Sequence, residues 1–385
     1  MANASVAILV PWLVLAQTGS ATDAGLVAAV ASVPGIVLSP FVGALVDRLG
    51  RRRVSVGSDV LSAVSVIGFP VLAAQGELDL STIIALTLLG AAFDPAGYTA
   101  RKSLIPDAAE ASEFGVARLN GIHEGIFSAG WVIGPALAAA GIATIGAVQT
   151  FWLTAVAFVL AALAVTALRV TEGREAARAA AGDEHEAFWA SSLRGARELW
   201  ADRPLRVLTV AIAVIVLVYM PTESVILPAY FQGIGEPRAY GLTMTMLAAG
   251  GMVGAFSYGW LSERLLLHRI AVGSLVACTV AMIPMALLPP LPIFVTAGFL
   301  LGLAWGPMNP LLNTLVQTRI PAHVQGRVYG VQTALFYAAP PVGLLLTGPA
   351  VDRWGVQPVY AVLGGMVALT TLLVAALPGL RDLDT

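Results

Sequence analysis

The sequence contains little charge for its length. Only 11% of its 385 residues are Asp, Glu, Lys or Arg, against about 25% in a typical soluble domain. Hydrophobic residues make up 58%, and the mean hydropathy is +0.83. So few charged side chains cannot cover the surface of a water-soluble protein of this size. The composition therefore excludes a soluble enzyme, a disordered chain and a nucleic-acid-binding protein, and it predicts a polytopic membrane protein.

Cysteine and lysine are almost absent. The single cysteine, Cys278, lies in an apolar run and excludes a disulfide scaffold, so we expect it to be a packing residue. The single lysine, Lys102, is not part of a Gly-x-x-x-x-Gly-Lys-Ser/Thr phosphate loop, which excludes an ATP-driven pump. The four histidines are scattered, with no nucleophile–base spacing. We therefore expect neither an enzyme nor a cofactor or metal site.

Long apolar runs dominate the chain. A helix needs about 20 mostly apolar residues to cross a bilayer. Twelve runs are present: 4–17, 24–46, 54–75, 80–100, 120–142, 149–168, 205–230, 239–260, 270–289, 291–316, 328–349 and 356–377. Eleven are long enough. The first is too short, with no basic region or cleavage site typical of a signal peptide, so we expect the chain to begin inside its first span.

Charge sidedness supports this count. Of the 21 Arg and Lys residues, 19 lie in alternate connecting segments, and only Arg238 and Arg353 lie on the other side. Cytoplasmic loops carry the Lys/Arg excess. We therefore expect a multi-pass protein of the cytoplasmic (inner) membrane with its C-terminus in the cytoplasm.

The chain divides into two similar halves. The charged, Ala-rich segment 169–204 is a predicted cytoplasmic linker between six-helix bundles at 1–168 and 205–385. The halves match at an offset of 215–216 residues: Gly43-Ala44-Leu45-Val46-Asp47-Arg48 with Gly259-Trp260-Leu261-Ser262-Glu263-Arg264, Asp94-Pro95 with Asn309-Pro310, and Ile105-Pro106 with Ile320-Pro321. Two parallel six-span halves predict an all-α transporter with substrate bound between them near mid-membrane. We expect a monomer, because each chain holds both halves.

A Gly- and Arg-rich string connects the second and third runs: Gly-Ala-Leu-Val-Asp-Arg-Leu-Gly-Arg-Arg-Arg. Gly43 lets another helix approach closely, and Gly50 permits a tight turn. Asp47, Arg48 and arginines 51–53 can form a charge cluster that breaks when the halves rock. Taken singly, arginines 51–53 are explained equally well as a positive-inside anchor, which does not explain the whole string.

This string resembles the signature loop of the major facilitator superfamily, Gly-x-Leu-x-Asp-Arg-x-Gly-Arg-Arg, and matches it throughout. The resemblance covers the whole chain and implies a fold of two six-helix bundles related by a pseudo-two-fold axis. It also implies that the loop is a gate clasp, carried here by Gly43, Asp47, Arg48, Gly50 and Arg51. An altered copy with Glu263 and Arg264 follows the eighth span, where Leu266 replaces the second glycine and implies a weaker clasp.

Three further strings resemble the branch of this superfamily that contains the enterobactin exporter and macrolide-efflux proteins. They lie at 11–20, 94–107 and 117–121. The fifth span contains Gly130-Trp131-Val132-Ile133-Gly134-Pro135, which resembles the family's antiporter motif Gly-x-x-x-Gly-Pro-x-x-Gly, with Ala138 replacing the last Gly. Small residues four apart form a groove for a neighbouring helix, and Pro135 bends the helix. Ordinary helix packing is the alternative; the family context favours an exporter.

Three acidic residues lie in the spans of the first half. A charge at mid-membrane costs at least about 2.5–3.5 kcal/mol, so each needs a reason. We expect Asp59 to join the arginine cluster of the loop. Asp94 has a neutral repeat partner, Asn309, which favours a hydrogen-bonding or substrate-lining role over proton transfer. Glu124 can extend to the cytoplasmic interface.

Glu223 is the most informative acid. It lies in the seventh span, flanked by Pro221 and Pro228, past the midplane toward the outside. The functional interpretation is a proton-coupling carboxylate; the alternative is an inert, hydrated residue at the outer mouth. Aromatic residues in the spans, among them Trp131 and Tyr219, together with Asn309, are candidates to line a substrate cavity.

Export of a hydrophobic or amphipathic small molecule (a drug, macrolide or siderophore-like compound) by proton antiport is the predicted function. An importer or facilitator of a small solute, and a transport-inactive scaffold, remain as alternatives. The expected partners are the small-molecule substrate, protons and the lipid bilayer, with no nucleic acid. The sequence does not identify the substrate.

Overall fold

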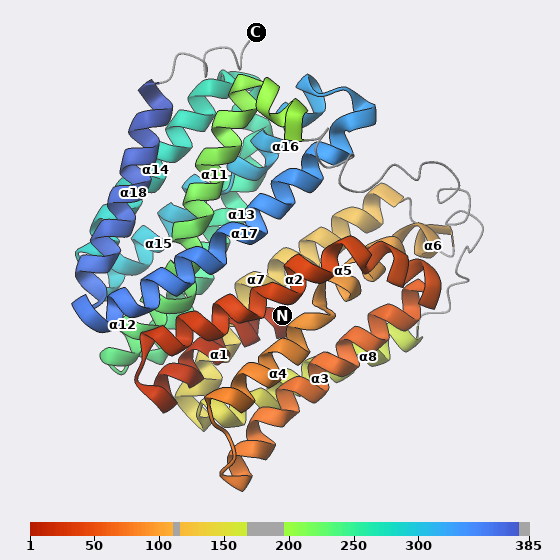
Figure 1. Ribbon diagram of the computed structural model, residues 1–385, viewed down its shortest axis with the longest axis vertical. Helices are drawn as coiled ribbons and strands as arrows, with labels where there is room; N and C mark the ends of the chain where they lie inside the picture. Colours follow the sequence, from red (N-terminus) through yellow and green to blue (C-terminus); the bar gives the residue numbers. More distant parts are fainter. Residues whose placement is uncertain (111–115, 168–195, 377–385) are drawn as a thin grey trace. The chain divides into compact units, whose positions relative to one another are not determined.

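The computed structural model describes residues 1–110, 116–167 and 196–376 of the chain (Figure 1). All regular structure in these residues is helical, as predicted. The chain divides into two compact units, Met1–His185 and Glu186–Thr385.

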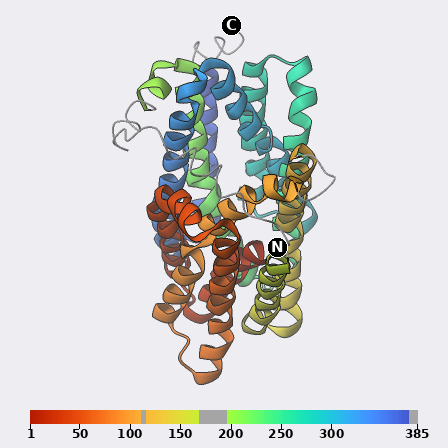
Figure 2. The ribbon, with the colours of Figure 1, turned by 90° about the vertical axis from the view of Figure 1, so that its right-hand side faces the viewer.

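The described residues of the first unit form eight helices, which run from α1 to α8. They are α1 (Ala2–Thr18), α2 (Ala21–Leu49), α3 (Arg51–Gln75), α4 (Leu80–Ala92), α5 (Asp94–Ser103), α6 (Ile105–Glu110), α7 (Val116–Ile145) and α8 (Ala147–Ala167). Within the unit, α3 packs against α8 and α5, and α1 packs against α7. Figure 2 shows the ribbon after a turn of 90° about the vertical axis. Phe69 of α3 and Phe151 of α8 stack with their ring centroids 4.3 Å apart.

The second unit runs from α11 to α18. Its elements are α11 (Arg203–Pro221), the π-helical segment η1 (Thr222–Ile226), α12 (Leu227–Gly233), α13 (Pro237–Arg264), α14 (Leu267–Ala286), α15 (Leu291–Trp305), α16 (Met308–Arg319), α17 (Ala322–Trp354) and α18 (Val356–Ala376). Residues 196–201, at the end of the predicted linker, are also helical, and Leu199 is fully buried in the core of this unit. Most of the predicted linker (residues 169–195 of 169–204) lies outside the described residues, so its extent stays a prediction.

Eleven segments of the described residues are long and apolar enough to cross a membrane. The helix α1 is shorter, with 17 residues. This agrees with eleven full-length apolar runs and a short first one, and it confirms an all-α, multi-pass membrane protein.

Three predicted spans are not continuous α-helices. The fourth is broken at Phe93, between α4 and α5, where Pro95 follows in the first turn of the new helix. The tenth is broken at Gly306 and Pro307. Proline has no N–H to donate and fits only the first turn of a helix without distortion. The seventh span instead contains the π-helical turn η1, directly after Pro221.

Glycines hold α13 and α15 together. A Cβ atom on Gly250 would collide with the carbonyl of Phe299, and one on Gly302 with the carbonyl of Leu247. Gly254 and Gly306 continue the contact one turn further along. The missing side chains let the two backbones touch, as in other small-xxx-small pairs of membrane helices.

Candidate functional site

The signature loop forms the turn between α2 and α3. Gly50 ends α2 with a positive φ of 92°, a conformation that favours glycine. Arg51 begins α3, and its Nη1 donates to Oδ2 of Asp107 on α6 at 2.8 Å. The sequence reasoning missed Asp107, although it follows the Ile105-Pro106 match of the internal repeat. Gly43, Asp47 and Arg48 lie in α2, but their side chains lie outside the described part of the structure.

The altered copy of the loop connects α13 and α14. Both Glu263 and Arg264 are exposed. The guanidinium carbon of Arg264 lies 4.4 Å from the centroid of the Trp260 ring, a cation–π contact on its own helix.

The glycine motif in α7 faces α1. Gly130, Gly134 and Pro135 are all buried. A Cβ atom on Gly130 would lie 2.6 Å from the backbone nitrogen of Met1, and one on Gly134 would lie 2.8 Å from Cβ of Ala4. The hydroxyl of Ser5 donates to the carbonyl of Gly134 at 3.1 Å. Small residues thus bring these helices into close contact, while Trp131 points outward with 41% of its surface exposed.

Asp94 lies at the break between α4 and α5 and is held by α1. The Nδ2 atom of Asn3 donates to both carboxylate oxygens of Asp94, at 2.8 and 2.9 Å. The break places this carboxylate at the start of α5 rather than within a continuous helix. Asn3 had no signal in the sequence, because its contact joins residues 91 positions apart.

Asp59 pairs with Arg101 and not with the signature arginines. Nη1 of Arg101, two turns after Asp94 on α5, donates to Oδ1 of Asp59 at 2.9 Å. The expectation that Asp59 joins arginines 51–53 is wrong, because α3 turns its Asp59 face toward α5 and Arg51 points to Asp107. Arg101 is therefore a functional candidate that the sequence reasoning missed.

Glu223 lies in the π-helical turn of the seventh span. Its carboxyl group lies near the hydroxyl of Tyr219, one turn earlier, and its backbone carbonyl accepts from the hydroxyl of Tyr240 at 3.2 Å. A proline at 228 would clash with the carbonyl of residue 224 in a regular α-helix, and the wider π turn, which includes residue 224, ends two residues before it. π turns are rare and occur often at functional sites.

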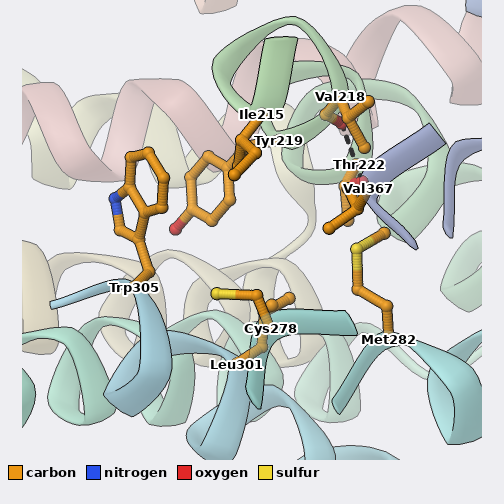
Figure 3. A pocket seen from close by; sticks show the side chains of 9 residues that line it. All are labelled: Ile215, Val218, Tyr219, Thr222, Cys278, Met282, Leu301, Trp305 and Val367. Atoms are coloured by element: carbon orange, nitrogen blue, oxygen red, sulfur yellow. Dashed lines mark hydrogen bonds between the residues drawn. The ribbon is translucent and has the colours of Figure 1, made fainter. Parts of the chain in front are cut away.

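A pocket in the second unit adjoins this turn (Figure 3). It is small and partly open, and it is lined by Ile215, Val218, Tyr219, Thr222, Cys278, Met282, Leu301, Trp305 and Val367. The rings of Tyr219 and Trp305 lie nearly parallel, with centroids 6.1 Å apart. The hydroxyl of Thr222 donates to the carbonyl of Val218 at 3.0 Å, so it presents no free donor to the pocket. The walls are therefore apolar, and Cys278 is a lining residue as well as a packing residue.

The remaining candidates lie apart from these clusters. Asn309 is exposed in the first turn of α16. The side chain of Glu124, on α7, lies outside the described part of the structure. Among the residues the structure describes, no three His, Cys, Asp or Glu side chains are grouped in a way that could hold a metal ion.

Sequence comparisons connect this architecture to known proteins. Residues 1–343 match the family model of the Major Facilitator Superfamily. The chain is 39% identical to the multidrug efflux pump Tap of Mycolicibacterium fortuitum, over 99% of this chain and 93% of that protein. It is 37% identical to Tap of Mycobacterium tuberculosis, over 97% and 89%. It is 23% identical to macrolide efflux protein A of Streptococcus pyogenes, over 96% and 90%.

Solved structures share the fold at much lower identity. The nucleoside transporter NupG matches with a TM-score of 0.75 at 11% identity, covering 97% of both chains. A D-xylose-proton symporter matches with a TM-score of 0.68 at 13% identity, covering 99% of this chain and 98% of that one. These matches confirm the predicted fold class. The chain therefore belongs to the Major Facilitator Superfamily, as a multi-pass membrane transporter and not an enzyme.

Proposed function

We propose that this transporter exports hydrophobic or amphipathic drugs across the cytoplasmic membrane in exchange for protons. The observation that carries the drug-efflux part is the 39% identity to a multidrug efflux pump over nearly the full length of both proteins. The macrolide efflux relative supports the same class of bulky, largely apolar substrate. The small pocket of the second unit has the apolar and aromatic lining that most ligand pockets share.

Proton coupling is the finer part of the proposal, and it rests on acids within the spans. Glu223 has a tyrosine hydroxyl as its side-chain partner. Within a span, an ionised carboxylate without a cation beside it is costly, whereas the protonated form is neutral. A transporter can therefore couple the binding and release of this proton to transport. We propose Glu223 as the coupling group of the second unit, beside the pocket that Tyr219 lines.

Alternating access is proposed to follow the two-half plan, with bundles 1–168 and 205–385, the linker 169–204 and the C-terminus in the cytoplasm. The Arg51–Asp107 pair is the part of the proposed gate clasp that the structure describes. We propose that this pair breaks and re-forms as the halves rock, and that the monomer is the transporting unit.

Drug-triggered proton movement in inverted membrane vesicles tests this function. Vesicles with an acidic interior receive ethidium or erythromycin, and a pH-sensitive dye inside them reports proton release. We expect release from wild type, loss of release in Glu223→Gln, and release in Glu236→Gln, a control acid at an exposed position of the same unit. Release that survives Glu223→Gln would keep antiport and remove Glu223 from it. No release from folded wild-type protein with either compound would contradict antiport and favour a facilitator or importer.

A further inference from the structure

We propose that Asp59, Asp94 and Arg101 of the first unit form a proton-exchange site. In this site the guanidinium group of Arg101 pairs with one carboxylate or the other. This inference rests on the proposed proton antiport and assigns a specific site to it. The site lies between α3 and α5 of the first unit, whereas Glu223 and the pocket belong to the second unit.

Arg101 pairs with Asp59 and lies on the same helix face as Asp94. Nη1 of Arg101 lies 2.9 Å from Oδ1 of Asp59. Asp94 and Arg101 are seven residues apart on α5 and so share one face of the helix, and helical side chains lean toward the N-terminus, here toward Asp94. The charge of Arg101 acts on Asp94 as well as on Asp59. A small movement of one flexible side chain can therefore shift its positive charge from one carboxylate to the other.

Close packing of α5 on α3 builds this arrangement. Gly97 lies between Asp94 and Arg101 on the same face, and a Cβ atom there would collide with the side chain of Ser58. The hydroxyl of Ser58 donates to the carbonyl of Phe93 at 2.9 Å, just before the helix break. The break, the glycine and the serine together bring both acids within reach of one arginine.

Charge balance then requires a proton. Two carboxylates and one guanidinium leave a net negative charge in a span, which is costly, and one bound proton removes it. The second oxygen of Asp59, Oδ2, is buried without a hydrogen-bond partner, as is the hydroxyl of Ser55 one turn earlier. The amide of Asn3 can donate to ionised Asp94, and its carbonyl can accept from protonated Asp94. Asn3 can thus form a hydrogen bond with Asp94 in both its ionised and its protonated state.

Other charged or titratable groups near this cluster are accounted for. Those on the elements packed around α5 are Lys102 over the Tyr98 ring, His123 near the same ring, Asp107 paired with Arg51, Arg52, which donates to the carbonyl of Thr166, the exposed Arg53, and Asp47 and Arg48, whose side chains are not described.

The internal repeat shows that the fold does not need these charges. At the matching positions of the second unit, Leu275 replaces Asp59 and Val316 replaces Arg101. Both are buried in one hydrophobic cluster, and Ala271 replaces Ser55. Replacing a buried ion pair by packed apolar residues is often neutral or stabilising. Since buried apolar residues occupy the matching positions of the second unit, we assign the charges of the first unit to transport rather than to folding.

Infrared difference spectroscopy during a pH titration tests the site directly. The background variant is Glu223→Gln, so that this acid of the second unit cannot titrate. We expect a titrating protonated-carboxyl band that Asp94→Asn removes. A band that persists in Asp94→Asn and disappears in Glu236→Gln would overturn the proposal, and so would the lack of any titrating carboxyl band.

Efflux of ethidium in cells gives the second readout. The variant Asp59→Leu/Arg101→Val carries the second unit's own residues, and we expect it to fold but to lose drug-driven proton release. The control, Asp202→Asn/Arg319→Gln, breaks a 2.7 Å ion pair of the second unit and keeps transport. Wild-type efflux and an unchanged pH profile in the apolar variant would overturn the proposal. If the wild-type protein releases no protons when drug is added, although its Asp94 band titrates, the result contradicts proton antiport but not the proposed proton-exchange site.

Discussion

In the first unit α3 meets α5 through Asp59 and Arg101, whereas in the second unit α14 and α16 carry Leu275 and Val316 at the matching positions. The two halves thus build related helix arrangements around different interiors. The first unit places charge and hydrogen-bonding groups between its helices. The second places a hydrophobic cluster there and keeps its acid, Glu223, beside an aromatic pocket. The comparison teaches that the fold tolerates either interior, so the difference points to separate tasks for the two halves.

Placing an acid at position 275, or a leucine at the matching position 59, tests this comparison. The first of these exchanges is expected to have the largest effect on the free energy of unfolding. Leu275→Asp removes a fully buried apolar side chain and introduces an acid without a cation, so we expect a loss of about 4–5 kcal/mol in unfolding free energy. Asp59→Leu should cost less, about 1–2 kcal/mol, because Arg101 can still turn to Asp94. Detergent unfolding midpoints measure both. Equal losses of unfolding free energy in Leu275→Asp and Asp59→Leu would contradict the difference between an apolar interior in the second unit and a charged one in the first.

The glycine contacts give a second comparison, between α15 and α14 of the same unit. Gly302→Ala places a Cβ atom against the carbonyl of Leu247, and the two backbones must separate. We expect a loss of about 3 kcal/mol. Gly273→Ala, on α14, meets nothing within 4 Å and should gain about 0.5–1 kcal/mol, because alanine favours the helix. Thermal unfolding of the purified variants checks this, and a stable Gly302→Ala would contradict the backbone contact.

The two copies of the signature loop offer the smallest effects. Arg51→Gln leaves Asp107 buried without its cation, and we expect a loss of about 1–2 kcal/mol together with slower efflux. Arg264→Gln removes only an exposed cation–π contact, and we expect about 0.5 kcal/mol with efflux unchanged. Unfolding midpoints and ethidium efflux rates separate the two copies. Slower efflux in Arg264→Gln than in Arg51→Gln would reverse their assignment as strong and weak clasp.

The site was predictable where chemistry follows from local sequence. The acids Asp94 and Glu223 stood out because ionisable groups are rare within spans, and the motif Gly130–Pro135 stood out by its spacing. Their partners did not. Asn3 contacts Asp94 from 91 residues away, and Arg101 contacts Asp59 from 42 residues away. No local pattern encodes such pairs, and for Asp59 proximity in sequence favoured the wrong arginines.

The sequence by itself determined the membrane class, the apolar spans, the internal repeat and the superfamily, because each depends on composition, periodicity or a contiguous string. Only the tertiary structure decided how the spans break and which polar groups meet. A proline within an apolar run was compatible with a break, as at Phe93, or with an unbroken helix, as at Pro340 in α17. Neighbouring helices decide between them, since in a membrane they alone can satisfy the freed backbone groups.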